Sequence, residues 1–468
     1  MLIGKRKRNS LLPWELMPVI LALAWPTMLE ELLQTAVQYI DTAMVGSLGT
    51  QATAAVGSTT TVNWLLGSTI HALGIGFLAY IAQAIGAGRK KDIPKAAAQA
   101  VMIVLICGSF FTALCVSLAG LVPVWMQVDP SIQDLASKYF LVVYASMLPR
   151  TAIIIFGTLL RACGDTKTPM RVGLLVNFCN VILNFLLIYP ARTISIFGTS
   201  IWIPGADIGV LGAAIASAAS FCVGGIVMTI CLYRHSMLSP QKQSLKPDAQ
   251  ILKPCLRVAL PNALQRFGTS LGYVAFASMI NALGEVTAAA HTIANTVESA
   301  FYIPGYGMQT ASATLAGNAY GAGDRRKIQE LTRMIVFIEV TLMILSGGLL
   351  FIFAPDMMSL FTKDSSVIAL GSIVLRMVAV SEPFYGVSIV LEGMMLGMGK
   401  TLQPFIVNII GMWGIRITGT FICTVFLRMG LVSAWACMIA HNLLLFVAFS
   451  VMYGKILGKK ENFSQNYT

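Results

Sequence analysis

Apolar runs of about 20 residues follow one another along almost the whole chain, separated by short breaks that contain glycine, proline and charged residues. A hydrocarbon core about 30 Å thick needs about 20 apolar residues per helix, so each run is long enough to span a membrane. The pattern predicts twelve spans, which begin near residues 16, 54, 98, 136, 169, 208, 255, 290, 332, 368, 404 and 431. We therefore expect an all-α integral membrane protein with twelve transmembrane helices.

The composition agrees with a membrane protein. Of 468 residues, 56% belong to the AVILMFWYC set and only 11% are charged, with a mean hydropathy of +0.77. Soluble domains carry about 25% charged residues, so most soluble classes are excluded. The net charge of +12 comes from sparse basic residues between the apolar runs, which argues against a nucleic-acid partner. The nine cysteines form no C-x-x-C pair, so neither a metal cage nor a disulfide framework is indicated.

The basic residues also predict the orientation in the membrane, because Lys and Arg collect in cytoplasmic loops. The N-terminus and every second loop, with Arg161 among them, hold most of the 32 Lys and Arg. The opposite loops hold only Lys138, Arg192, Lys363 and Arg428. We expect a multi-pass protein of the plasma membrane with both termini in the cytoplasm.

The chain repeats itself at an offset of 235 residues. Pro26 matches Pro261, and the Gly-Ala-Gly of residues 86–88 matches residues 321–323. Near the sixth span the offset drops to 221, which leaves 14 extra residues in the outer loop around residues 190–207. The duplication predicts two six-helix bundles of the same orientation, with a substrate cleft between them near the membrane midplane.

The spans also set the expected domain boundaries. Two bundles are joined by a cytoplasmic linker and flanked by a basic cytoplasmic N-terminus and a cytoplasmic tail. The predicted ranges are 1–15 for the N-terminus, 16–232 for the N-terminal bundle, 233–254 for the linker, 255–453 for the C-terminal bundle and 454–468 for the tail.

The first span carries a stripe of polar residues. Glu31, Gln34, Gln38 and Asp41 recur at steps of three and four residues, which places them on one helix face. An acidic side chain at the centre of a membrane helix costs about 2.5–3.5 kcal/mol on insertion, so such residues are candidates for function. We expect this stripe to face the interior of the bundle.

Two further spans offer oxygen ligands. Asn180 and Asn184 lie one turn apart in the fifth span, and Ser217 lies in the sixth. A hard cation such as Na⁺ is bound by oxygen atoms, and one carboxylate with amide and hydroxyl oxygens is a reasonable set for a weak, reversible site. The carboxylate alone could instead take a proton.

The second half carries intramembrane polar groups at different positions. The candidates are Gln265, Arg266, Glu298 and Glu382. A buried Arg266 needs a partner, because an unpaired buried ion costs several kcal/mol, and Glu298 or Glu382 is expected to supply it. Structural pairing and cation handling both remain open for the two acids.

Five segments in order resemble motifs of the multidrug and toxic compound extrusion (MATE) transporters. The segments are residues 39–49 with a late Asp and V-G-x-L-G, 83–88, 160–169, 289–291 with 303–304, and 320–323. The resemblance covers nearly the whole chain. It implies two bundles in a V-shaped arrangement and the export of cationic amphipathic compounds in exchange for Na⁺ or H⁺.

The resemblance also implies a cation site in the N-terminal bundle. The family's acid in the first helix, its Asn and acid in the fifth and its Thr in the sixth match Asp41, Asn180, Asn184 and Ser217 here. Asn184 thus replaces an acid and Ser217 a threonine. If the chain is coupled to sodium, Asp41 is the metal ligand. The 235-residue partner of Asp41 is Phe276, so this polar set is expected in one bundle only.

No enzymatic pattern is evident. Residues 397–401 end like a phosphate loop, but Met394 stands where such a loop needs glycine. We expect a secondary active multidrug efflux transporter with no cofactor besides its coupling ion. Its expected partners are cationic drugs or dyes, Na⁺ or H⁺ and the lipid bilayer, with no nucleotide or nucleic acid. The alternatives are a flippase for a lipid-linked oligosaccharide or precursor, which would favour an Arg-lined cleft, and a non-transporting membrane scaffold.

Overall fold

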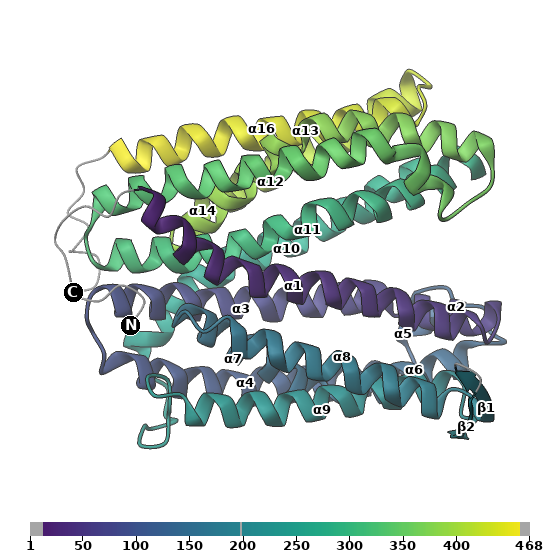
Figure 1. Cartoon of the computed structure of the whole chain (residues 1–468), viewed down its shortest axis with the longest axis horizontal. Helices are drawn as coiled ribbons and strands as arrows, with labels where there is room; N and C mark the ends of the chain where they lie inside the picture. Colours follow the sequence, from purple (N-terminus) through teal and green to yellow (C-terminus); the bar gives the residue numbers. More distant parts are fainter. Residues whose placement is uncertain (1–12, 197–198, 459–468) are drawn as a thin grey trace.

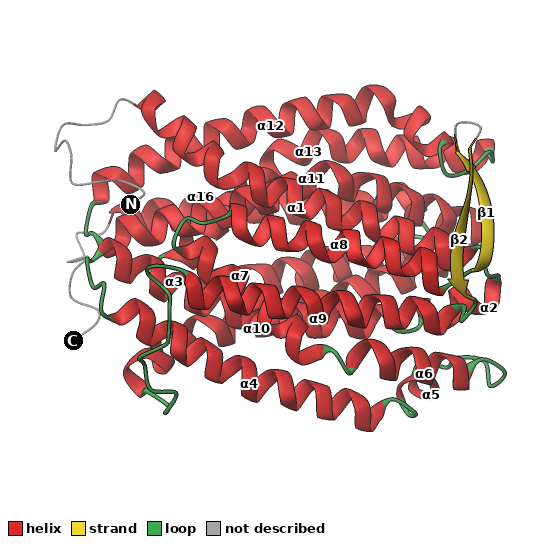
Figure 2. Cartoon of the chain, turned by 60° about the horizontal axis from the view of Figure 1, so that its bottom comes forward, coloured by secondary structure: helices red, strands yellow, loops and turns green. Residues whose placement is uncertain are grey.

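The computed structural model describes residues 13–196 and 199–458. Within these ranges the chain consists almost entirely of long helices that run roughly parallel to one another (Figure 2). The basic residues 5–8 of the predicted cytoplasmic N-terminus and residues 459–468 of the predicted tail lie outside the described residues.

The first half of the chain contains six long helical units. Two of them are broken: α2 is followed at once by α3, and α6 bends by 46° into α7. The elements are α1 (Pro13–Gly46), α2 (Thr50–Gly57), α3 (Thr60–Gly86), α4 (Asp92–Leu118), the short α5 (Val122–Trp125), α6 (Gln133–Tyr144), α7 (Met147–Ala162), α8 (Lys167–Leu187) and α9 (Val210–Arg234).

The second half repeats this arrangement with straighter helices. Its fifth unit alternates between α-helical and π-helical turns, over residues 402–426. The elements are α10 (Ala249–Asn281), α11 (Glu285–Gly321), α12 (Arg325–Ser359), α13 (Ser365–Gly397), α14 (Leu402–Ile409), η1 (Ile410–Ile417), α15 (Thr418–Phe421), η2 (Ile422–Phe426) and α16 (Leu431–Gly458).

The described helices are long enough for twelve membrane spans. Nine of these units in residues 13–458 are also apolar enough to cross a membrane, or ten if the bent α6 and α7 form one span. The other two units, α10 and α11, do not meet the same measure, and they carry Arg266 and Glu298. The expected all-α fold with six spans per half is confirmed.

The extra residues of the first half form an antiparallel hairpin, β1 (Pro190–Ile196) and β2 (Thr199–Ala206), where the sequence predicted only a longer loop. It lies at the end of the molecule opposite the start of α1 and the end of α16 (Figure 1). A side chain at Gly205 would collide with the backbone of Tyr189 and Pro190, so only glycine fits there. The Tyr189 hydroxyl lies 2.8 Å from Ser47 Oγ, which ties the base of the hairpin to the end of α1.

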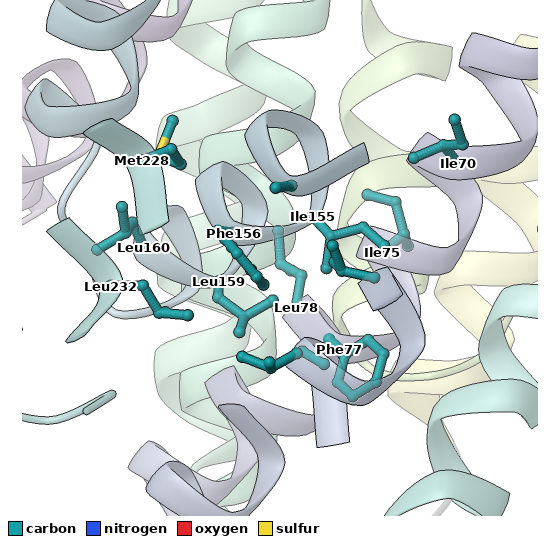
Figure 3. Packing of buried hydrophobic residues seen from close by; sticks show 14 of the residues in the cluster. Ile70, Ile75, Phe77, Leu78, Ile155, Phe156, Leu159, Leu160, Met228 and Leu232 are labelled. Atoms are coloured by element: carbon teal, nitrogen blue, oxygen red, sulfur yellow. The ribbon is translucent and has the colours of Figure 1, made fainter. Parts of the chain in front are cut away.

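Each half has an apolar core. In the first half, Ile75 and Leu78 of α3 interdigitate with Ile155 and Leu159 of α7 (Figure 3). The core of the second half centres on the fully buried Trp435, together with residues of α11, α12 and α13.

Two helices, α1 and α10, are shared between the cores. Leu16 and Ile20 of α1 pack among α11, α12, α13 and α16 of the second half, and α1 only later reaches α8 and its own half (Figure 1). Their partners at the 235-residue offset, Ile251 and Cys255 of α10, pack in the core of the first half. Further along α10, Phe276 packs in the core of the second half. Each of these helices therefore crosses from one bundle to the other near its middle.

The two halves meet tightly where α3 and α11 end. The contacts on the two sides of this crossing are equivalent. Gly86 lies against the backbone of Asn318, and Gly321, its equivalent at the 235-residue offset, lies against the backbone of Gln83. The Gln83 side chain also donates to the Gly397 carbonyl oxygen at 2.9 Å. Glycine is required at these crossings because a β-carbon would occupy the position of the opposing backbone.

The repeat extends to two turns outside the spans. Asp129 and Asp364, which are 235 residues apart, accept hydrogen bonds of 2.8 Å from the backbone nitrogens of Ser131 and Ser366. These bonds, with those from the serine hydroxyls, hold the pKa of both carboxyl groups below its usual range. Equivalent local structure has thus been kept at both positions.

Candidate functional site

The four residues predicted to bind a cation lie together. Asp41 of α1 accepts a hydrogen bond of 2.6 Å from the Asn184 amide nitrogen of α8. Asn184 also contacts Asn180 one turn away at 3.1 Å, and the Asn180 amide lies 3.1 Å from the Ser217 hydroxyl of α9. Asn180 and Asn184 are buried, while Asp41 and Ser217 are half-buried. We call these four residues the Asp41 cluster.

The Asn180 amide lies between Asp41 and Ser217 in the Asp41 cluster. One of its two terminal atoms lies 2.8 Å from Asp41 Oδ1 and 3.1 Å from Oδ2. If this atom is the nitrogen, it donates to the carboxylate, and the amide oxygen accepts from Ser217. If it is the oxygen, three oxygen atoms face one another and need a proton or a cation between them. Asn184 Oδ1 is buried and has no hydrogen-bond partner among the described residues.

The surroundings of the Asp41 cluster differ from those of the equivalent place in the second half. Asp41 lies near the end of α1, next to the Met44 carbonyl that accepts from Tyr189 at 3.2 Å. Tyr139 of α6 is close enough to respond to the charge of Asp41. In the second half, Phe276 occupies the place equivalent to Asp41 and is buried in an apolar core. The site can therefore take a hard cation or a proton through one carboxylate, two amides and a hydroxyl.

The rest of the α1 stripe has varied surroundings. Gln34 and Gln38 are exposed, whereas Glu31 is half-buried. The neighbouring Glu30 forms an ion pair of 2.6 Å with Arg161 of α7. The assignment of Arg161 to a cytoplasmic loop was wrong: α7 continues past the apolar run, and the guanidinium is largely enclosed in the bundle. Gly173 of α8 leaves the space that Glu30 occupies.

The expected pairing of Arg266 with Glu298 or Glu382 was also wrong. Across the ranges 13–196 and 199–458, no ion pair includes Arg266, and its Nε is buried without a hydrogen-bond partner. The charge of Arg266 acts instead on Glu31 and Glu392. Glu298 has a different arginine, Arg416, as its charged neighbour.

Gln265, next to Arg266, has a partner that was not foreseen. Its amide nitrogen donates to Glu392 Oε1 of α13 at 2.6 Å. Asn408 of α14 donates to the same oxygen at 3.1 Å, and Gln309 of α11 to Glu392 Oε2 at 3.3 Å. Three amide donors thus satisfy a single carboxylate, which costs less than leaving it unpaired.

Glu298 and Glu382 belong to a second buried group in the C-terminal half. Glu339 of α12, which the sequence interpretation overlooked, joins them: it is 0% exposed and lies against Gly305 and Gly386. The carboxylate oxygens of Glu339 and Glu382 have no hydrogen-bond partner within the described part of the chain. An acid inside an apolar span is itself the signal for Glu339.

A different arginine faces Glu298. The charge of Arg416 acts on Glu298, and its guanidinium stacks on Phe276 with 4.2 Å to the ring centroid. It also lies 4.9 Å from the centroid of Tyr273. No group of three or more His, Cys, Asp or Glu in residues 13–196 and 199–458 is arranged to hold a metal ion. The oxygen-rich Asp41 cluster, with a single acid, is the better candidate for a weakly held ion.

Comparisons with known proteins agree with the repeat. The family model MatE matches the chain twice, over residues 26–186 and 261–422, so that the two matches begin 235 residues apart. The probable multidrug resistance protein NorM of Thermotoga maritima is 29% identical over 436 residues, which is 92% of each chain.

Solved structures show the same fold. The chain resembles the outward-facing conformation of a multidrug resistance MATE family transporter of the MOP superfamily, with a TM-score of 0.85, 23% identity and coverage of 94% of this chain and 95% of the other. It also resembles a MOP superfamily transporter from Pyrococcus furiosus, described as having a binding pocket of reverse polarity, with a TM-score of 0.85, 24% identity and coverage of 94% and 95%. The double match across most of the sequence shows that the chain belongs to the MatE family, the MATE transporters.

Proposed function

We propose that this protein exports cationic amphipathic compounds across the plasma membrane in exchange for Na⁺ or H⁺ bound at the Asp41 cluster. The observation that carries the proposal is the meeting of Asp41, Asn180, Asn184 and Ser217 from three helices, with no hydrogen-bond partner for Asn184 Oδ1 in the described part of the chain. An unpartnered buried oxygen beside a carboxylate favours a bound cation. The relatives named as multidrug resistance proteins support the choice of substrate.

The ion acts on the substrate through α1 in this proposal. When the cluster is empty, the Asn180 nitrogen donates to Asp41. When Na⁺ binds, the amide turns so that its oxygen coordinates the ion, and a proton on Asp41 has the same effect on the amide. Either event draws α1 toward α8 and α9, while Leu16 and Ile20 hold the other end of α1 in the C-terminal core. Ion binding in one bundle therefore changes how that bundle sits against the other.

The energy source in this scheme is the ion gradient. Each charge moved inward is worth about 2.3 kcal/mol per 100 mV of membrane potential. The orientation that we propose, with both termini in the cytoplasm, places the Asp41 cluster in the outer half of the membrane. An incoming ion then reaches Asp41 from outside and lowers the affinity for the compound to be released on the same side.

Competition between ion and dye tests the proposal on the purified protein. In the wild type, addition of Na⁺ or a lower pH is expected to weaken binding of a fluorescent cationic dye. Asp41→Asn keeps the size of the side chain but removes its charge, so dye affinity should become independent of the ion. Asp356→Asn, at an exposed position near the C-terminal end of α12, is the matched control and should behave like the wild type. Unchanged ion competition in Asp41→Asn would refute the assignment.

A further inference from the structure

Two thiols meet where the last two helical units of the second half are joined. Cys423 lies on η2 and Cys437 on α16, and their sulfur atoms are 4.0 Å apart. Both cysteines are free, and both are half-buried. They are 14 residues apart in the sequence, so no C-x-x-C spacing predicts the pair. The proposed export makes no use of these thiols.

The turn between η2 and α16 adds a third sulfur-bearing side chain. The backbone nitrogen of Met429 donates to the Cys423 carbonyl oxygen at 2.8 Å. Arg428, just before Met429, has a left-handed backbone with φ 52°. This combination is typical of a Schellman helix end, which commonly brings the two hydrogen-bonded residues into side-chain contact. Cys423, Met429 and Cys437 accordingly line one open hollow of about 510 Å³.

The first half has no thiols at the equivalent positions. At the 235-residue offset Cys423 corresponds to Ile188, and at the 221-residue offset Cys437 corresponds to Ala216. Both of these residues are fully buried. The helical unit that carries Cys423 contains π-helical turns, whereas its equivalent α8 is α-helical throughout. Such turns are rare and are often found at functional sites. The duplicated fold therefore does not require the thiol pair.

Gly419 of α15 leaves room for one of the two sulfur atoms. A β-carbon at Gly419 would lie 3.0 Å from Cys437 Sγ. Gly419 is the 235-residue partner of Asn184, which donates to Asp41 in the first half. Equivalent places therefore present an amide of the Asp41 cluster in one half and a thiol in the other.

The distance between the sulfur atoms fits a soft ion with three ligands. Bonds of about 2.3 Å, the length of a zinc–thiolate bond, to two sulfur atoms 4.0 Å apart meet at an angle of about 120°. This is the angle of trigonal coordination, which leaves one position for the thioether of Met429. Thiolate and thioether ligands suit Cu⁺. Zn²⁺ instead prefers four ligands in a tetrahedron, and hard ions such as Na⁺ are bound by oxygen.

We propose that Cys423, Cys437 and Met429 form a binding site for Cu⁺. The ion takes the place of the two thiol protons, which pass to water, so neither copper nor sulfur changes its oxidation state. The bound group carries one negative charge, and the exposed Arg428 in the same turn carries a positive charge. The turn lies at the hairpin end of the molecule (Figure 1), and the ion joins η2 to α16 across it. This site is independent of the Asp41 cluster and of the proposed export.

Titration of the purified, reduced protein with Cu⁺ tests the site. Under anaerobic conditions the ion is shared between the protein and the chelator bicinchoninate, whose copper complex is measured by its absorbance. The wild type is expected to hold one equivalent of Cu⁺ against the chelator and to unfold at a higher temperature when copper is bound. Zn²⁺ should not displace this equivalent, because the site lacks a fourth ligand.

Variants of the three ligands identify the site. Cys423→Ser and Cys437→Ser should each weaken Cu⁺ binding by more than about a hundredfold, and Met429→Leu by about tenfold. Cys222→Ser, at an exposed cysteine of α9, is the matched control and should bind like the wild type. Gel filtration and thermal unfolding without copper show that each variant is folded before its affinity is compared.

Several results would overturn the inference. If the wild type holds no Cu⁺ against the chelator, the thiol pair is not a copper site. If the two Cys→Ser variants still hold the equivalent, other cysteines bind it, and full affinity in Met429→Leu would remove the thioether from the ligand set. A further arm needs no substitution. Protein in which mass mapping has shown a disulfide between the two cysteines should no longer hold Cu⁺, and retention of the ion by this form would refute the site.

Discussion

The glycine crossing between α3 and α11 makes a strong prediction about conformation. A β-carbon added at Gly86 would lie 2.8 Å from the carbonyl carbon of Asn318 and 2.9 Å from the backbone nitrogen of Ala322. The β-carbon would also overlap the Asn318 carbonyl oxygen, its nearest neighbour, and carbon atoms in contact prefer about 3.5–4.0 Å, so Gly86→Ala must separate the two helices by more than about 0.7 Å. The opposing atoms are backbone of a packed helix and cannot move aside as a flexible side chain would.

The expected effect is a shift away from the conformation in which the halves meet here. Overpacking a tight contact costs about 1–3 kcal/mol. This corresponds to a change of about 5- to 150-fold in the population of molecules in which the ends of α3 and α11 are in contact. Gly321→Ala, at the equivalent position, would place its β-carbon 2.7 Å from the carbonyl carbon of Gln83 and should act in the same direction. The magnitude of the two effects should be similar because the crossing is nearly symmetric.

Distances between spin labels on the ends of α3 and α11, measured by pulsed electron resonance in nanodiscs, show directly whether the two helix ends are in contact. Both variants should shift the distribution toward longer distances. Gly348→Ala is the matched control, since nothing lies within 4 Å of a β-carbon there. If Gly86→Ala gave the same distances as Gly348→Ala, the crossing would not control closure and the reasoning would be refuted.

Two other predictions concern packing. Glu30→Gln leaves the enclosed Arg161 without its partner, so we expect the free energy of unfolding to fall by about 3–5 kcal/mol in thermal or denaturant unfolding. The control Glu330→Gln, in an exposed ion pair, should cost less than about 1 kcal/mol. Equal effects of the two variants would show that Arg161 is not enclosed. Cys423 and Cys437 have their sulfur atoms 4.0 Å apart, so mild oxidation should link them in the folded protein, as peptide mass mapping would detect. Absence of this link after oxidation would contradict the placement of α16 against η2.

The fold was largely predictable because its determinants are periodic. Apolar run length determines the number of spans, and the 235-residue repeat determines their grouping into halves. The exchange of helix ends between the cores was not predictable in the same way: Leu16 and Ile251 look like any apolar residues of a first span. The hairpin at residues 190–206 was also missed, because a short two-stranded loop has no strong signal beside twelve apolar runs.

The side chains that meet in the N-terminal half were easier to predict than those that meet in the C-terminal half. Asp41, Asn180 and Asn184 are spaced along helix faces and match a family motif, so their meeting follows once the helices are neighbours. The partner of Arg266 depends on how α10 is rotated relative to the other half, which sequence spacing does not determine. Glu339, by contrast, was predictable, since the rule applied to Asp41 also applies to it.

The central claim is that Asp41 couples ion entry to export, and flux across a membrane tests it most directly. Proteoliposomes preloaded with dye are given an inward Na⁺ gradient or an inward proton gradient, each imposed alone. The account predicts that at least one gradient accelerates dye export by wild-type protein and by Asp356→Asn. It further predicts that Asp41→Asn, which still binds dye, shows no acceleration by either gradient. Gradient-driven export by Asp41→Asn at the wild-type rate would contradict the account.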